Sequence, residues 1–392
     1  MTYIQRGTTE FKKVNLALFA GGFCTFAILW GTQPLLPDIA KEFQLTPAMA
    51  SLSLTTTTIT LAISLLFIGS LSDQYGRKNI MAISLVASAF LAILTGFAPT
   101  FPLLILCRIL QGITLAGLPA VAMAYLGEEV ERKSLGFAMG LYISGNSVGG
   151  MAGRIINGFL TDYFNWHIAL MGIGIVSLLA TIIFWLFLPP SAHFTAHKLQ
   201  LKHFTTTLLS PFKTPGLPYL FLIGFLLQAG FVSLYNYIGF ELIQPPYSLS
   251  QTLVGFIFIV YIVGTFSSTW MGMLADLHGK RKILLLALLI LLIGVCITLQ
   301  FNLWIKIIGI AIFTFGFFAG HSIASSWVGE LGKRDRAQAA ALYLFFYYLG
   351  GSIGGTASGT FYHHFDWIGV VVAIVAFSVL SLFVTARLRT EG

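Results

Sequence analysis

Charged residues are scarce in this chain: they make up 9% of its 392 residues, whereas hydrophobic residues make up 57%. Soluble domains carry about 25% charged residues, so the composition excludes a protein surrounded by water on all sides. Apolar runs long enough to cross a bilayer, about 20 residues each, recur along the sequence. They cover residues 14–37, 48–72, 79–98, 102–126, 135–161, 166–188, 217–240, 251–274, 281–300, 304–328, 338–362 and 367–386. The sequence therefore predicts an all-α integral membrane protein with about twelve transmembrane helices.

Cysteine and the motifs of catalysis are also nearly lacking. The three cysteines, Cys24, Cys107 and Cys296, fall within predicted helices, so no disulfide framework is expected. The sequence contains no G-x-x-x-x-G-K-[ST] segment for ATP and no H-E-x-x-H or cysteine pair for zinc. A G-x-S-x-G match at 350–354 lies inside an apolar run, which is the wrong context for a hydrolase nucleophile. We expect no enzyme activity, cofactor or metal, and a driving force from an ion gradient or from the solute itself.

The cations that are present lie on one side of the predicted helices. Of the 22 lysines and arginines, all but Lys41, Lys306, Arg108 and Arg154 lie in the termini and in every second loop. Cytoplasmic loops retain Lys and Arg. This pattern predicts that both termini lie in the cytoplasm. It explains the net charge of +8 without a nucleic-acid partner.

One phrase occurs twice. Residues 69–81 read GSLSDQYGRKNIM, and residues 272–284 read GMLADLHGKRKIL. Other pairs keep nearly the same separation, among them Gly127-Glu128 with Gly329-Glu330 and the segment 149–166 with 350–367. The chain is therefore expected to contain two parallel copies of one bundle, an architecture that transporters use with the site at the interface of the copies.

A joint rich in proline and basic residues separates the two copies. The predicted domains are an N-terminal six-helix bundle at 1–188, a cytoplasmic linker at 189–216 and a C-terminal six-helix bundle at 217–392.

The repeated phrase links the second and third predicted helices of each copy. Its second glycine permits a tight turn, and its aspartate stands at a helix C-terminus, where the dipole disfavours a carboxylate unless a cation or another helix's N-terminus faces it. An exposed loop pair would contribute under about 1 kcal/mol. Because the motif recurs in register, we interpret it instead as a clasp that holds the cytoplasmic side shut. The candidate gating residues are Gly69, Asp73, Gly76, Arg77, Asp276, Gly279, Lys280 and Arg281.

These motifs resemble those of the major facilitator superfamily. The phrase at 69–78 resembles its signature loop, 272–281 is a looser match, and Arg108-Ile-Leu-Gln-Gly112 resembles the fourth-helix motif of its proton-coupled members. Segments 115–129, 140–154 and 235–250 are similar to the YnfM-like branch of bacterial inner-membrane transporters, in the drug–proton antiporter group. The resemblance therefore implies a bacterial inner-membrane location. The resemblance covers essentially the whole chain. It implies alternating access, efflux of a small organic solute or drug by proton antiport, and a monomer in the bilayer.

The sequence departs from the motifs of this group at two places, which bear on the expected export and on the charge of the solute. The exporter motif of the fifth helix usually has Gly-Pro where this chain has Gly145-Asn146, so a proline bend cannot be assumed. Cation exporters of the group usually have a carboxylate inside the first helix. Among the 14 acids here, only Asp38 and Glu241 approach membrane depth, each from the outer side. A neutral or anionic solute is therefore favoured, and aromatic side chains could pack its apolar part.

The two copies differ at three ionisable positions: Arg108 aligns with an alanine, Arg154 with a glycine and His321 with a leucine. Ionisable groups inside a bilayer are functional candidates by default. The alternative for both arginines is that Asp38 or backbone carbonyls satisfy them, so that they only lock the first bundle. The candidate substrate-binding and coupling residues are Trp30, Gln33, Asp38, Arg108, Asn146, Arg154, Tyr235, Asn236, Glu241 and His321.

Proton coupling needs a group that changes charge, and the unperturbed pKa of histidine lies near physiological pH. We therefore predict that His321 carries or senses the proton, with Arg108 gating or binding the solute and Asp38 as its possible counter-ion. A structural histidine at 321, with Asp38 as the proton carrier, is the alternative. Two other functions stay open: a facilitator or importer without proton coupling and, more distantly, a membrane receptor or scaffold.

Overall fold

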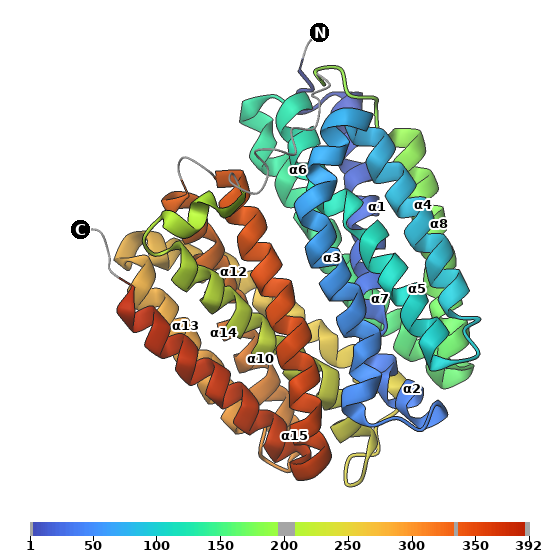
Figure 1. Ribbon diagram of the computed structural model, residues 1–392, viewed down its shortest axis with the longest axis vertical. Coiled ribbons are helices and arrows are strands. Elements are labelled where there is room, and N and C mark those ends of the chain that lie inside the picture. Colours follow the sequence, from blue (N-terminus) through green and yellow to red (C-terminus); the bar gives the residue numbers. More distant parts are fainter. Residues whose placement is uncertain (1–2, 195–207, 333–335, 389–392) are drawn as a thin grey trace. The chain divides into compact units, whose positions relative to one another are not determined.

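The computed structural model describes residues 3–194, 208–332 and 336–388, and within them the chain is helical apart from its connections and one isolated bridge between Ile4 and Val130. Part of the predicted linker and some predicted cytoplasmic cations, such as Lys198 and Lys333, lie outside these ranges. The α-helices are α1 (Thr9–Gly31), α2 (Leu36–Glu42), α3 (Pro47–Tyr75), α4 (Arg77–Thr95), α5 (Phe101–Leu115), α6 (Gly117–Glu129), α7 (Arg132–Tyr163), α8 (Trp166–Phe187), α10 (Leu217–Ile243), α11 (Gln251–Phe256), α12 (Tyr261–His278), α13 (Lys280–Ile297), α14 (Leu303–Leu331) and α15 (Arg336–Arg387) (Figure 1). Short 3₁₀ segments are η1 (Gln33–Leu35), η2 (Ser210–Lys213) and η3 (Ile257–Val260).

Each of the twelve apolar runs corresponds to helix. Within the described residues, nine spans are long and apolar enough to cross a membrane on length and composition alone. The other three runs have simple explanations. α7 is rich in glycine and polar residues, α13 begins with three consecutive cations, and α15 contains two runs separated by Asp366, whose φ of 50° is not helical. The predicted all-α membrane fold is confirmed.

Contacts divide the chain into two compact units. Unit 1 comprises Met1–Asp38, Thr56–Gln200 and Gln251–Phe256, and unit 2 comprises Ile39–Thr55, Leu201–Ser250 and Ile257–Gly392. In unit 1, α1 packs mainly on α7 and α8. In unit 2, α10 packs most extensively on α15 and also on α14.

The same glycine contacts hold the first and fifth helices of each copy together. In unit 1 a Cβ at Gly149 would lie 2.3 Å from the Phe23 carbonyl oxygen, and one at Gly153 would lie 2.6 Å from the Ala27 Cα. In unit 2, Gly350 meets the Phe225 carbonyl in the same way, with 2.0 Å to a built Cβ. Only glycine permits backbones to approach this closely. These equivalent contacts show which residues of the two copies correspond: Gly149 to Gly350 and Phe23 to Phe225.

Local sequence explains where the helices begin. The Thr8 hydroxyl accepts a hydrogen bond from the Phe11 N–H, and the Asn165 and Asn302 carboxamides cap α8 and α14 in the same manner. Gly76 and Gly279 precede α4 and α13 with the same φ of 93°, a conformation that glycine adopts without steric cost. The repeated phrase therefore folds into the same turn twice.

Candidate functional site

The first candidate site lies where α1 ends in the middle of an apolar run. The last carbonyls of a helix have no intrahelical donor, and here Pro34 has no N–H to offer the Trp30 carbonyl. The chain continues as the short segment η1, in which the Leu35 N–H donates to the Thr32 carbonyl at 3.1 Å. The end of α1 therefore presents backbone oxygens to neighbouring helices inside unit 1. In a lipid environment such groups require internal partners.

Arg108 on α5 supplies two of these partners. Its guanidinium donates to the Ile28 carbonyl at 3.4 Å and to the Leu29 carbonyl at 3.3 Å. A third bond, of 2.7 Å, goes to the Gln111 side-chain oxygen one turn further along α5. The residue is 1% exposed. Backbone carbonyls are thus among the partners of Arg108, as one of the two sequence-based interpretations expected.

Arg154 on α7 reaches the same end of α1. Its Nε donates to the Gln33 side-chain oxygen at 2.9 Å, one terminal nitrogen donates to the Gly150 carbonyl at 2.6 Å, and the guanidinium lies 5.2 Å from the centre of the Trp30 ring. Asn157, one turn along α7, donates to the Gly31 carbonyl at 2.9 Å. The structure thus brings three of the candidates, Trp30, Gln33 and Arg154, together. Asn157 lies with them and was not selected from the sequence.

The second copy shows why this arrangement is confined to the first. With a separation of 202 residues, as between Ala27 and its counterpart Ala229, Pro34 corresponds to Asn236. Asparagine has an N–H, so α10 continues unbroken through this position to Ile243. The glycine aligned with Arg154, Gly355, leaves its space to Val232 and to the Asn236 amide nitrogen, which lie 2.5 and 3.4 Å from a built Cβ. The first copy thus has both the break in its first helix and the buried Arg154. At the equivalent positions the second copy has a continuous helix and Gly355.

Two further candidates of unit 1 lie elsewhere. Asp38 on α2 accepts a hydrogen bond of 2.6 Å from the Gln251 amide. Asn146 lies in the middle of α7, which continues unbroken from Arg132 to Tyr163. Its side-chain oxygen would be 2.3 Å from a Cβ on Gly22, so the amide fills space that only a glycine on α1 leaves free.

Two candidates of unit 2, Tyr235 and His321, lie in an aromatic cluster. The Tyr235 hydroxyl is 2.6 Å from the Thr314 hydroxyl, and the Tyr235 ring packs against Phe231, whose ring centre lies 3.8 Å from that of Phe317. His321 is half-buried on α14, one turn after Phe317. Its Nδ1 lies 3.0 Å from the Tyr343 hydroxyl.

Glu241 pairs with a buried cation. The Nζ of Lys306 on α14 lies 2.8 Å from the Glu241 carboxylate at the end of α10, and Lys306 is only 2% exposed. The rings of Tyr247 and Trp367 lie 5.0 and 5.3 Å from this ammonium. A buried charge requires such a counter-ion. The sequence analysis set Lys306 apart from the cytoplasmic cations but did not identify it as the partner of Glu241.

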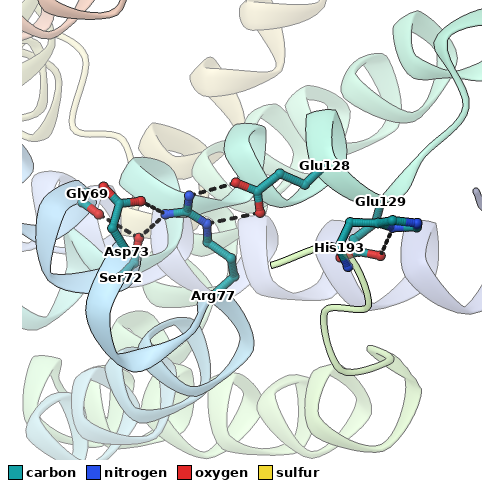
Figure 2. Close-up of polar contacts among 7 residues, drawn as sticks. All are labelled: Gly69, Ser72, Asp73, Arg77, Glu128, Glu129 and His193. Atoms are coloured by element: carbon teal, nitrogen blue, oxygen red, sulfur yellow. Dashed lines mark hydrogen bonds and ion pairs between the residues drawn. The ribbon is translucent and has the colours of Figure 1, made fainter. Parts of the chain in front are cut away.

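The first copy of the repeated loop forms a network around Arg77 (Figure 2). Its guanidinium lies 2.5 Å from the Asp73 carboxylate and 2.7 Å from that of Glu128, and it donates to the Ser72 hydroxyl at 2.6 Å. The Ser72 hydroxyl in turn donates to the Gly69 carbonyl at 2.7 Å. The cation of Arg77 thus faces Asp73 and offsets the unfavourable interaction between the carboxylate and the helix dipole. The side chain of Arg77 is 10% exposed and that of Asp73 is 42% exposed, so the arginine forms the protected centre of the network.

The second copy repeats half of this arrangement. Lys280, the counterpart of Arg77, forms an ion pair with Glu330, the counterpart of Glu128, and donates to the Ser326 hydroxyl at 3.1 Å. Asp276 is exposed, and no ion pair joins it to another described residue. Neither glutamate was selected from the sequence. The signal for both was the alignment of the two Gly-Glu pairs.

Comparison with known proteins gives the family. The Major Facilitator Superfamily profile matches residues 18–244 and 220–392. YybF of Bacillus subtilis, an MFS-type transporter, is 50% identical over 388 residues, which are 99% of this chain and 96% of the relative. The inner membrane transport protein YnfM of Escherichia coli is 44% identical, with 99% of this chain and 93% of the relative covered.

Solved structures show the same fold at low sequence identity. A mutant form of the nucleoside transporter NupG superimposes with a TM-score of 0.77 at 17% identity, covering 96% of this chain and 100% of that one. A D-xylose–proton symporter gives 0.76 at 14% identity, with 97% of each chain covered. Helical spans, the repeated loop, the family profile and close relatives agree: this chain belongs to the major facilitator superfamily and is a membrane transporter.

Proposed function

We propose that this transporter is a proton-coupled exporter of a small organic solute that is neutral or anionic, working by alternating access between bundles at 1–188 and 217–392. The observation that carries the proposal is the broken end of α1, where Arg108 and Arg154 donate to buried backbone and amide oxygens. Discontinuous helices form the substrate sites of many secondary transporters. Two buried guanidinium groups disfavour a cationic solute and complement an anionic group.

We propose His321 as the residue that carries the proton. It is half-buried on α14 and shares a hydrogen bond with Tyr343, so a change in its charge would be felt by two helices of unit 2. Imidazole is the side chain whose unperturbed pKa, about 6.5, matches cellular pH. Arginine does not release its proton in this range. The absence of an ATP-binding motif from the sequence is consistent with drive by an ion gradient.

The proposal can be tested on the purified protein. A thermal-shift screen against metabolites and drugs would select solutes that stabilise it. Each selected solute is then measured in proteoliposomes with an imposed pH gradient. We expect solute movement against the direction of proton flow that collapses when the gradient is dissipated. Transport that ignores the gradient would instead establish a facilitator.

His321→Gln is expected to abolish gradient-driven accumulation of the selected solute and to leave solute exchange across the membrane intact. Glutamine keeps a hydrogen-bonding side chain but cannot take up a proton. The matched control is His278→Gln, because His278 is exposed at the end of α12. If the His321→Gln variant still accumulates solute, the proton is carried elsewhere, and Asp38 becomes the candidate to test.

We also propose that both termini are cytoplasmic, in a bacterial inner membrane. Single cysteines replacing the exposed Lys133 and Lys213 should react with an impermeant thiol reagent only in inverted vesicles. A cysteine at the exposed Ser248 should react in intact cells. The background carries Cys296→Ser, because Cys296 is an exposed free cysteine. Labelling of Lys133→Cys in intact cells would contradict the orientation.

A further inference from the structure

Two segments that flank the first bundle meet at the end of α6. Residues 3–6 precede α1, residues 188–194 follow α8, and we call them together the polar strap. The Ile4 N–H donates to the Glu129 carbonyl at 2.9 Å, and the Ile4 carbonyl accepts from the Glu131 N–H at 3.0 Å. In the second segment the Leu188 carbonyl accepts from Lys78 at 2.5 Å and the Pro189 carbonyl accepts from Tyr125 at 2.9 Å. The strap is therefore fixed to α4 and α6 by its backbone.

The Glu129 side chain joins the two segments of the strap. Its carboxylate accepts from the His193 backbone N–H at 2.9 Å and lies 3.1 Å from His193 Nδ1, which carries the proton in such a contact because a carboxylate only accepts (Figure 2). The His193 ring stacks on Tyr3 with a centroid distance of 4.5 Å. Glu129 is 2% exposed, and a carboxylate buried to this degree requires donors. His193, a residue of the strap, supplies two such donors, its backbone N–H and its Nδ1.

The strap also reaches the repeated loop. Glu129 follows Glu128 on the last turn of α6, and Glu128 binds Arg77 through two nitrogens, at 3.2 and 2.7 Å. The next strap residue after His193, Phe194, places its ring 5.6 Å from the Arg77 guanidinium carbon. Two consecutive strap residues therefore reach this region: His193 contacts Glu129, which is next to Glu128, and Phe194 contacts Arg77 itself.

In the second copy the corresponding segments also meet, but an apolar residue stands in the place of Glu129. The counterpart of Glu129 is Leu331, which lies 2.9 Å from a Cβ built on Gly216, just before α10. The same built Cβ lies 3.8 Å from Leu388, just after α15. Arg281, the counterpart of Lys78, donates to the Ala386 carbonyl. Segments before the first helix and after the last helix thus meet in both copies. Among the described residues, a buried carboxylate joins them only in the first copy.

We propose that Glu129 and His193 are positioning residues: they fix the end of α6 and the start of the linker so that Glu128 and Phe194 hold Arg77 in the loop network. The inference rests on the gating role proposed for the loop at 69–78. It assigns a task to the linker beyond connection, because its first residues belong to the same network as the gate. In the second copy an apolar residue, Leu331, takes the place of Glu129.

Hydrogen–deuterium exchange of the full chain in nanodiscs tests this without a ligand. His193→Ala removes the Nδ1 bond to Glu129, and exchange of residues 69–80 should accelerate at least about tenfold, the effect expected from loss of one charge-assisted hydrogen bond. His193→Asn places an amide nitrogen where Nδ1 was and should restore most of the protection. His278→Ala, within the second loop, is the matched control and should leave exchange of residues 69–80 unchanged.

Residues 272–283 serve as the internal reference in the wild-type and His193 samples. The proposal is overturned if His193→Ala speeds exchange only in the strap, or equally in both loops, or if His193→Asn fails to restore protection. Transport by Asp73→Asn separates this inference from the proposed function. If that variant transports normally while His193→Ala loosens residues 69–80, the positioning role stands and the gating role fails.

Discussion

Replacing Arg108 with methionine is expected to abolish transport and to destabilise the protein by about 2–4 kcal/mol, because two buried carbonyls at the end of α1 lose their donors. The Ile28 and Leu29 oxygens cannot turn to water, since Arg108 and its surroundings are buried. Thermal unfolding of the purified variant in detergent measures the loss. Uptake of a solute selected by thermal shift measures the activity.

Arg108→Lys separates support of the helix end from contact with the solute. Lysine retains the positive charge and can donate to one or more carbonyls, but it lacks the planar fork of the guanidinium. We expect it to recover most of the stability and little of the transport. A lysine variant with wild-type turnover would show that the residue only satisfies the backbone. A stable, active methionine variant would contradict both roles.

Asp73→Asn is expected to reduce transport turnover at least about tenfold without unfolding the protein, because the charge-assisted contact with Arg77 is lost while the contact with Glu128 remains. Asp276→Asn is the matched control from the second copy. Asp276 is exposed and Lys280 pairs with Glu330 instead, so its effect should be within about twofold, the range of an exposed charge. Initial rates at equal expression give both values.

Normal turnover in the Asp73→Asn variant would refute the clasp. Equal, large losses in both aspartate variants would show that the two loops contribute alike, which their different contacts do not lead us to expect. Arg77→Gln should be more damaging than either, because Arg77 contacts Asp73, Ser72 and Glu128 together.

The sequence was sufficient where a local signal determines the backbone. Long apolar runs predicted the helices, and Gly76 and Gly279 predicted two identical turns, which have the same φ. The glycines aligned in the fifth helices became equivalent close contacts, because a missing Cβ is a property of the residue itself. Even the break in α1 had a local signal, Pro34. That signal alone does not indicate that Arg108 donates to carbonyl oxygens at the end of α1.

Choice of partner was harder to predict, because it depends on residues far apart in the chain. Sequence analysis found Glu241 but not Lys306, 65 residues away, and found Arg77 but not Glu128, 51 residues away. Many acids and bases could have paired at those separations, and only packing selects among them. Backbone carbonyls are harder still. Every residue has one, so nothing in the side-chain sequence marks the two that meet Arg108.

The contact between Gly22 and Asn146 has a consequence for how the family can vary. The Asn146 side-chain oxygen fills the place of a Cβ on Gly22, and the Asn146 and Tyr142 backbone atoms stand only 3.2 Å from that place. An alanine at position 22 would therefore push the Asn146 side-chain oxygen out of its present place. We expect the two positions to vary together across the family, because a larger residue at position 22 requires another rotamer or a smaller residue at position 146.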